Sequence, residues 1–302
     1  RFRRVGSQLQ ALTLPQWIGT RYGSQGMRAG FSVLSLGLVA YAVLIVVALA
    51  LVLSALLGLP PQGLAAVILV FVLLCVGIGG ANTSAWTNAV QATIMLAVAL
   101  LLIGAGLPLF WEGEGLFARI AAQDPNLVTL TNPTSLYFRS LFEVFFCNFL
   151  VGLALVCQPH IVGKVLSLRS DKQVRTYLLV AASAGLVFLA VLVVGLYARA
   201  TVDPTTRVDL VVPVWIGQTF SPTLQVIVTL GLLSAGLSTL EGILLALAGI
   251  FAVDIHPLLG LKRSPLAFGR GGLLAVAVAT LLLAWRQMAD PTGGTVAIFA
   301  QY

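Results

Sequence analysis

Long runs of apolar residues, each without a charged side chain, constrain this chain more than any other feature. Residues 30–58 contain no Asp, Glu, Lys or Arg, and several later runs of 18 or more residues also lack charges. A run of that length lets an α-helix cross the ~30 Å hydrocarbon layer of a membrane. Only 9% of the residues are charged, against about 25% in ordinary soluble domains. The sequence therefore predicts an all-α, polytopic membrane protein.

Pro, Gly and charged residues divide the apolar sequence into predicted spans. The chain starts at Arg1 rather than Met and stops inside an apolar stretch at Tyr302, so we expect a fragment of a longer protein, truncated at both ends. We predict a single transmembrane domain over residues 1–302, with seven spans at about 30–58, 63–80, 86–110, 136–157, 173–198, 222–254 and 268–287.

The distribution of Lys and Arg predicts which loops face the cytoplasm. Loops on one side carry twelve of these residues, five in 1–28, four in 158–175 and three in 255–270, and the opposite loops carry five. Because cytoplasmic loops are enriched in Lys and Arg, we expect residues 1–28 in the cytoplasm and the protein in the cell (inner) membrane. The net charge of +7 is scattered singly along the loops, which argues against a nucleic-acid partner.

The sixth predicted span, 222–254, carries polar side chains near its middle. At 100° per residue, Ser234, Ser238 and Glu241 form one stripe, and Thr239 lies about 100° away. Small hydroxyl side chains also occur where helices pack or bond back to a carbonyl, so the stripe alone permits both interpretations. Glu241 favours a functional site, because an acidic side chain inside a membrane normally faces a cavity or a partner.

Adjacent hydroxyls at this depth suit a hard monovalent cation such as Na⁺. Such an ion is satisfied by hydroxyl and carbonyl oxygens rather than by nitrogen or sulfur ligands. The two hydroxyls of Ser238 and Thr239 are too few for a complete site. We expect the remaining oxygens on unwound backbone of a neighbouring broken helix, as in many secondary transporters.

The fourth predicted span, 136–157, ends in a second polar stretch. Asn148 and Gly152 interrupt its aliphatic sequence, and Pro159 should end or break the helix. His160 follows beside a basic loop, so we expect it at the cytoplasmic edge, about half a membrane away from Ser238. That separation argues against an intramembrane hydrolase that would use these two side chains.

Four motifs at consistent spacing carry a family resemblance. They are TLPQWIGTRYGS at 13–24, GGANTSAWTNAVQ at 79–91, QPHIVGK at 158–164, and LLSAGLSTL at 232–240 with Asp254 beyond it. In this order they resemble the sodium:solute symporter family, most closely its bacterial proline-permease-like branch. The second motif is similar to a polar hinge between two spans of that family, and the fourth to its L-L-S-A…S-T-L helix that ends in D-I or D-L.

The resemblance implies a core of ten helices in two inverted repeats of five, of which the seven spans would be helices three to nine. It also implies a sodium site formed by the hydroxyls of Ser238 and Thr239 and the backbone carbonyl of Ala235. The other ligands of that site belong to the broken first core helix of the family, so the chain alone should not transport. Glu241 has no counterpart in the family pattern, which makes it a candidate coupling residue particular to this chain.

The function that follows from the resemblance is transport, and no catalytic residue is predicted. Na⁺ would be the co-transported ion, and the partner would be a small organic solute of the amino acid or carboxylate type. We expect that solute near Asn148, Val151, Gly152 and Leu155 during alternating access. Two alternatives stay open, namely proton coupling through Glu241 and a channel or non-transporting membrane subunit.

Overall fold

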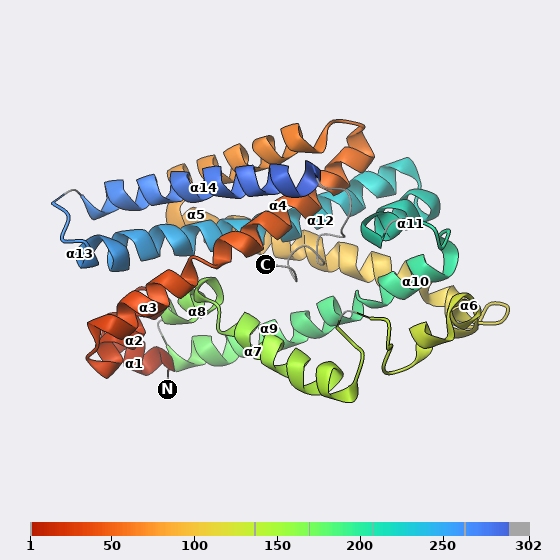
Figure 1. Cartoon of the computed structure of the whole chain (residues 1–302), viewed down its shortest axis with the longest axis horizontal. Helices are drawn as coiled ribbons and strands as arrows, with labels where there is room; N and C mark the ends of the chain where they lie inside the picture. The colour runs from red at the N-terminus through yellow and green to blue at the C-terminus, as the bar shows by residue number, and fades with distance from the viewer. Residues whose placement is uncertain (1, 136, 169, 207, 263, 290–302) are drawn as a thin grey trace. The chain divides into compact units, whose positions relative to one another are not determined.

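The protein is entirely helical in the part of the chain that the computed structural model describes, and no β-strand occurs in that part (Figure 1). The described residues are 2–135, 137–168, 170–206, 208–262 and 264–289, without the side chains of 78–85 and 209. The chain folds into two compact units: unit 1 comprises residues 1–93, 158–178 and 232–302, and unit 2 comprises residues 94–157 and 179–231.

Unit 1 consists of short helices at its N-terminus and long apolar helices after them. In chain order these helices are α1 (Phe2–Gln8), α2 (Leu14–Tyr22), α3 (Gln25–Ser35), α4 (Leu38–Leu57), the first part of α5 (Pro61–Gly106), α8 (Pro159–Leu166), the start of α9 (Asp171–Ala190), most of α12 (Pro222–Ile250), the π-helix η5 (Phe251–Ile255), α13 (His256–Leu258) and α14 (Pro265–Ala289).

Single residues explain where the short helices begin and end. Thr13 caps α2, since its hydroxyl accepts a hydrogen bond from the backbone N–H of Gln16 at 3.2 Å. Gly23 ends α2 at a φ of 62°, a left-handed conformation that glycine adopts without strain. Ser24 then caps α3 by accepting from the N–H of Met27 at 3.2 Å. α2 and α3 therefore form a helical hairpin, called here the α2–α3 hairpin.

The core of unit 1 is formed by four long helices. α14 packs along α4 and also contacts η5 (Figure 1). The buried apolar side chains come from α4, α5, α12 and α14 and include Val46, Val47, Val72, Leu240, Leu244, Leu247, Leu273 and Val276. In a membrane these side chains leave lipid rather than water, so close van der Waals packing is the main stabilising contribution of this core.

Unit 2 consists of shorter helices joined by irregular segments. In chain order they are the rest of α5, η1 (Leu107–Phe110), α6 (Leu116–Gln123), η2 (Pro125–Val128), the π-helix η3 (Phe142–Cys147), α7 (Asn148–Val156), the rest of α9, α10 (Val193–Thr201), η4 (Val208–Leu210), α11 (Val211–Thr219) and the start of α12.

The ring of Tyr197 is the largest fully buried side chain of unit 2. Its hydroxyl donates to the backbone carbonyl of Ile103 in α5 at 3.2 Å. The rings of Phe110 and Trp215 lie 6.0 and 6.1 Å from it, centroid to centroid. α10 is thereby joined to α5, η1 and α11.

The Tyr197 ring lies in space that is open only because Gly106 has no side chain. A Cβ atom added at Gly106 would lie 2.0 Å from Tyr197 Cδ2, whereas one added at Gly104 would meet nothing within 4 Å. We expect Gly106→Ala to lower the free energy of unfolding by about 1–3 kcal/mol, the usual cost of overpacking. Thermal unfolding in detergent measures this change, with Gly104→Ala as the matched control. Equal unfolding temperatures for the two variants would contradict this packing.

Long apolar helices lie over most of the predicted spans, and their crossing of a membrane stays a prediction. Among the described residues, five helical stretches are long and apolar enough to cross a membrane, and the broken pair Phe142–Val156 and Pro159–Leu166 makes a sixth when it is counted as one. The predicted break at Pro159 is therefore present. The predicted span 63–80 lies within the first part of α5, of which Pro61–Gly77 is an apolar stretch with described side chains. The five stretches are Gln25–Leu57, Trp86–Phe110, Asp171–Thr201, Pro222–Leu258 and Pro265–Ala289.

Two boundaries differ from the prediction. Residues 81–85, predicted as a break between spans, have helical backbone within α5, and the side chains of 78–85 lie outside the described part. No Pro occurs between Gln62 and Leu107, so nothing in that sequence forbids helical hydrogen bonding. Helix in the predicted span 136–157 starts only near Phe142. There the hydroxyl of Ser140 accepts a hydrogen bond from the backbone N–H of Glu143 at 3.4 Å.

Candidate functional site

Three oxygen atoms lie together near the middle of α12. The hydroxyls of Ser238 and Thr239 each donate a hydrogen bond to the backbone carbonyl of Ala235, both at 3.0 Å. This is the usual way in which Ser and Thr bond back along a helix, to the carbonyl three or four residues earlier. The structure thus brings together the three residues that the sequence predicts as sodium ligands, and their role as ligands stays a prediction.

The packing of α12 determines which of its faces is covered. Gly236 faces α4, where a Cβ atom added to it would lie 2.6 Å from Leu49 Cδ1, so glycine there lets the two helices approach closely. Ser238 and Thr239 are only half-buried. The hydroxyl pair therefore lies at the edge of the core of unit 1. Three apolar side chains of the next two turns have no exposed surface, Leu240, Ile243 and Leu244.

This arrangement can contribute part of the coordination shell of a hard cation. A hydroxyl that donates a hydrogen bond keeps two lone pairs, so the oxygens of Ser238 and Thr239 can still face an ion. The Ala235 carbonyl accepts both hydroxyl hydrogens, so at least one hydrogen must rotate away before that oxygen can join. Hard cations take about six oxygen ligands or more. Three oxygens on one helix therefore require further ligands from another segment.

Glu241 lies beside the hydroxyl pair in sequence but is buried, with 3% of its surface exposed. A carboxyl group at such a depth needs polar surroundings if it is to ionise. The neighbouring Gly242 faces His160, since an added Cβ atom would lie 3.9 Å from the His160 ring. His160 is 8% exposed and lies against the ring of Tyr41, with 6.2 Å between centroids. Its Nδ1 atom is buried and has no hydrogen-bond partner in the described chain.

The predicted separation of His160 from Ser238, about half a membrane, was wrong. The sequence predicts it at the membrane edge, far from Ser238, whereas its ring packs beside Gly242, one helical turn after Ser238. The physical reason is the break before Pro159, which starts a new helix whose first turn buries His160 in unit 1. The distance argument against an enzyme therefore no longer applies, and the case against one rests on the comparisons below.

The residues predicted to bind the solute share one face of α7. Asn148, Val151, Gly152 and Leu155 follow the i, i+3, i+4, i+7 spacing of a helix face, and all four are exposed in the described chain. The Asn148 side-chain NH₂ group donates to the carbonyl of Glu143 in η3 at 2.9 Å, so it is directed at backbone. These residues belong to unit 2 and the hydroxyl pair to unit 1. Their role in solute binding stays a prediction.

Sequence reasoning missed two features of the helices that carry the predicted site residues or adjoin them in sequence. The first is the pair of π-helices, η3 directly before α7 and η5 directly after α12, a kind of turn that is frequent at functional sites. The second is a buried ion pair between Arg28 and Asp254. The sequence contains one signal for this pair. Arg28 and Asp254 are single charged residues at the ends of apolar spans, and each needs a partner of opposite charge if it is to be buried.

Comparisons with known proteins bear on the whole chain. A family model described as "Sodium:solute symporter family" matches residues 1–298. The chain is also similar to a sodium/pantothenate symporter of Haemophilus influenzae, with 24% identity over 187 residues, which cover 59% of this chain and 37% of that protein. The family and these matches concern transporters and not enzymes.

A solved structure of a Na⁺-coupled sialic acid symporter, described as a substrate-bound outward-open state, has a similar fold. The TM-score is 0.75 at 16% sequence identity, and the match covers 96% of this chain and 64% of that one. At this identity the likeness concerns the fold alone. It confirms the predicted all-α transporter fold, with which an inverted repeat is consistent. The chain spans less than two thirds of the length of either relative.

Proposed function

Because the chain belongs to the sodium:solute symporter family, we propose that it forms the core of a symporter that uses Na⁺ to import a small organic solute. One observation carries this proposal: two hydroxyls converge on one carbonyl oxygen in the middle of a helix that is long and apolar enough to cross a membrane. We further propose that the protein is a multi-pass protein of the cell membrane with residues 1–28 in the cytoplasm, as the distribution of Lys and Arg favours.

In the proposed mechanism Na⁺ is cargo that the protein releases in every cycle. Ser238 and Thr239 contribute hydroxyl oxygens and Ala235 its carbonyl oxygen, and a second segment of the intact transporter contributes the others. An ion that has lost its water is stable only when both sets of ligands surround it. Na⁺ binding therefore favours the conformation in which the two segments are close, and the solute binds that conformation better.

The solute that we propose is a small organic acid or amino acid. Two relatives are named for transport of pantothenate and of sialic acid, both organic acids, which supports a carboxylate class. On α7, Val151 and Leu155 would contact the carbon skeleton, and Asn148 beside Gly152 would contact a polar group. The four sequence motifs favour the proline-permease-like branch of the family.

Uptake by the intact transporter in proteoliposomes tests the proposed function. A screen of thermal stability with and without Na⁺ first selects solutes whose stabilising effect requires both ligands. The selected solute should then accumulate when an inward Na⁺ gradient is imposed and should not accumulate when K⁺ replaces Na⁺. Accumulation that is equal with Na⁺ and with K⁺ would exclude sodium coupling.

Proton coupling is a second candidate, favoured by the burial of Glu241 at 3% exposure and by the unpartnered ring nitrogen of His160 close by. The same vesicles separate the two functions, because an inward proton gradient can be imposed without Na⁺. Uptake that persists under those conditions and stops when an ionophore dissipates the pH gradient would support Glu241 as the coupling group.

A further inference from the structure

The Asp254 carboxylate has no exposed surface and is held at both of its oxygens. The hydroxyl of Thr13 donates to Oδ2 at 2.6 Å, and the Arg28 Nε–H donates to Oδ1 at 2.8 Å. The three side chains are called here the Asp254 cluster. They join segments that lie more than 200 residues apart in sequence, and they join the first and fourth of the motifs found in the sequence.

The α2–α3 hairpin brings both partners to Asp254. Thr13 is the cap of α2, and Arg28 lies in the first turns of α3. The stem of Arg28 crosses Gly19, where an added Cβ atom would lie 2.6 Å from Arg28 Cβ, so α2 and α3 are in close contact there. Arg28 also donates from Nη2 to the backbone carbonyl of Val253 at 2.6 Å. One guanidinium group therefore holds both the side chain and the backbone of η5.

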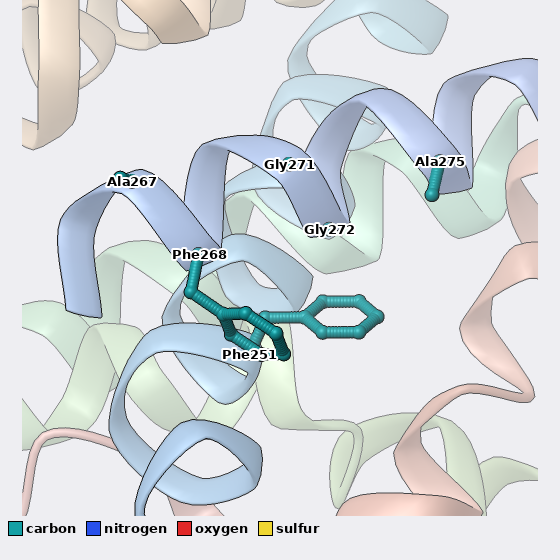
Figure 2. A pocket seen from close by; sticks show the side chains of 6 residues that line it. All are labelled: Phe251, Ala267, Phe268, Gly271, Gly272 and Ala275. Atoms are coloured by element: carbon teal, nitrogen blue, oxygen red, sulfur yellow. The ribbon is translucent and has the colours of Figure 1, made fainter. Parts of the chain in front are cut away.

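The other side of η5 packs on α14 through apolar contacts. Figure 2 shows Phe251 of η5 and Phe268 of α14 lining a shallow pocket of about 350 Å³ beside Gly271 and Gly272. Glycine at 272 is required there, because an added Cβ atom would lie 2.4 Å from Phe251 Cγ. η5 therefore lies between the polar contacts of the hairpin and the apolar contacts of α14.

These two kinds of contact constrain η5 differently. Apolar packing is not directional, so it permits small rotations of a helix about its own axis. Hydrogen bonds weaken steeply as their angle departs from linear, so a carboxylate that is held at both oxygens fixes the rotation of its helix. α12 runs from Ser238 into η5 without a break. A rotation at Asp254 is therefore carried along the helix backbone to the turn that contains Ser238.

We infer that Thr13 and Arg28 are positioning residues for the proposed sodium site and act on it through Asp254. They do not touch the ion. They set the rotation of α12, and with it the direction in which the Ala235, Ser238 and Thr239 oxygens face. The inference rests on the proposed function, and the α2–α3 hairpin thereby becomes a determinant of sodium affinity.

Two substitutions at Thr13 test the inference in the intact transporter in proteoliposomes. Thr13→Val keeps the shape of the side chain but removes the hydroxyl, and Thr13→Ser retains it. We expect Thr13→Val to raise the Na⁺ concentration for half-maximal uptake about 5-fold, the effect of losing the hydrogen bond to Asp254. The hydrogen bond from the Gln16 N–H, which caps α2, is also lost and should lower the unfolding temperature. The solute concentration for half-maximal uptake at saturating Na⁺ should stay unchanged, and Thr13→Ser should behave as the parent does.

A matched control separates positioning from general loss of structure. Ser35→Ala removes a buried hydroxyl of the same hairpin, which donates to the carbonyl of Phe31 at 2.7 Å and does not take part in the Asp254 cluster. It should leave the Na⁺ dependence unchanged. If Thr13→Val also leaves it unchanged, and lowers the unfolding temperature only as Ser35→Ala does, Thr13 has a structural role and the inference is wrong.

Two further results distinguish this inference from the proposed function. Uptake by the parent that does not depend on Na⁺ would overturn the proposed function and the inference with it. If Thr13→Val does not fold, Arg28→Lys takes its place, because it keeps the charge but cannot hold both Asp254 and the Val253 carbonyl as a guanidinium does. A folded Arg28→Lys variant with the parent's Na⁺ dependence would overturn the inference alone.

Discussion

Replacing Ser238 and Thr239 together by Ala is expected to raise the Na⁺ concentration for half-maximal uptake about 100-fold. A hydrogen bond or contact to a charged group contributes about 1.5–3 kcal/mol, so two lost oxygens at the lower end of this range cost about 3 kcal/mol, or about 100-fold. The Ala235 carbonyl remains, which is why we expect weakened binding rather than complete loss. Uptake of a fixed solute over a series of Na⁺ concentrations, at constant ionic strength, measures the effect.

The control for this prediction is Ser234→Ala, because Ser234 lies on the same helix stripe but outside the predicted ligand set. It should keep the Na⁺ dependence of the parent. A double variant with unchanged Na⁺ dependence would remove the hydroxyl pair from the sodium site. A double variant with lower maximal uptake but the same half-maximal Na⁺ concentration would point to helix packing as the role of these hydroxyls.

Replacing Asp254 by Ala is expected to lower the free energy of unfolding by about 3–5 kcal/mol, the usual cost of leaving one partner of a buried ion pair unpaired. The Arg28 side chain is 16% exposed and Asp254 is not exposed at all, so the guanidinium would stay largely buried without its counter-ion. Thermal or denaturant unfolding of the purified protein in detergent, without Na⁺, measures this loss separately from transport.

An exposed ion pair in the same unit is the matched control for Asp254→Ala. The Asp171 side chain is 54% exposed, and it pairs with Arg3 at 14% exposure and Arg4 at 69%. A carboxylate that water reaches contributes little to stability through its pairs, because water and salt screen them. Asp171→Ala should therefore change the unfolding temperature much less than Asp254→Ala. Equal shifts of the unfolding temperature would mean that the burial of Asp254 does not increase the contribution of its ion pair to stability.

The helices could be predicted from the sequence because hydropathy determines which segments can leave water. The sixth span is an example: the prediction gives 222–254, and the helical stretch runs over Pro222–Leu258. The break at Pro159 was also predictable, since a Pro residue lacks the N–H group that continues a helix. Both properties depend on the local sequence alone.

The arrangement around the site depended on contacts that the local sequence does not contain. Hydropathy does not distinguish a π-helix from an α-helix, so η5 could not be predicted from the apolar residues that form it. The burial of His160 depends on the direction of α8 after the break, and α8 is held by contacts with α1 and α2, which are distant in sequence. The contact of Thr13 with Asp254 joins residues 241 apart in sequence, although each lies in a motif that the family resemblance identifies.

The π-helix η5 also determines how the residues that follow α12 are rotated about the helix axis. A π-turn contains one residue more than an α-turn, and one residue corresponds to about 100° of rotation about a helix axis. If residues 251–255 were regular α-helix, the direction of the Asp254 side chain relative to Ser238 would change, and its contacts with Thr13 and Arg28 would not form in the same way. The deletion of a single residue in η5 would thus separate the Asp254 cluster without removing any of its side chains. The length of this segment, and not only its composition, is part of what the sequence must preserve.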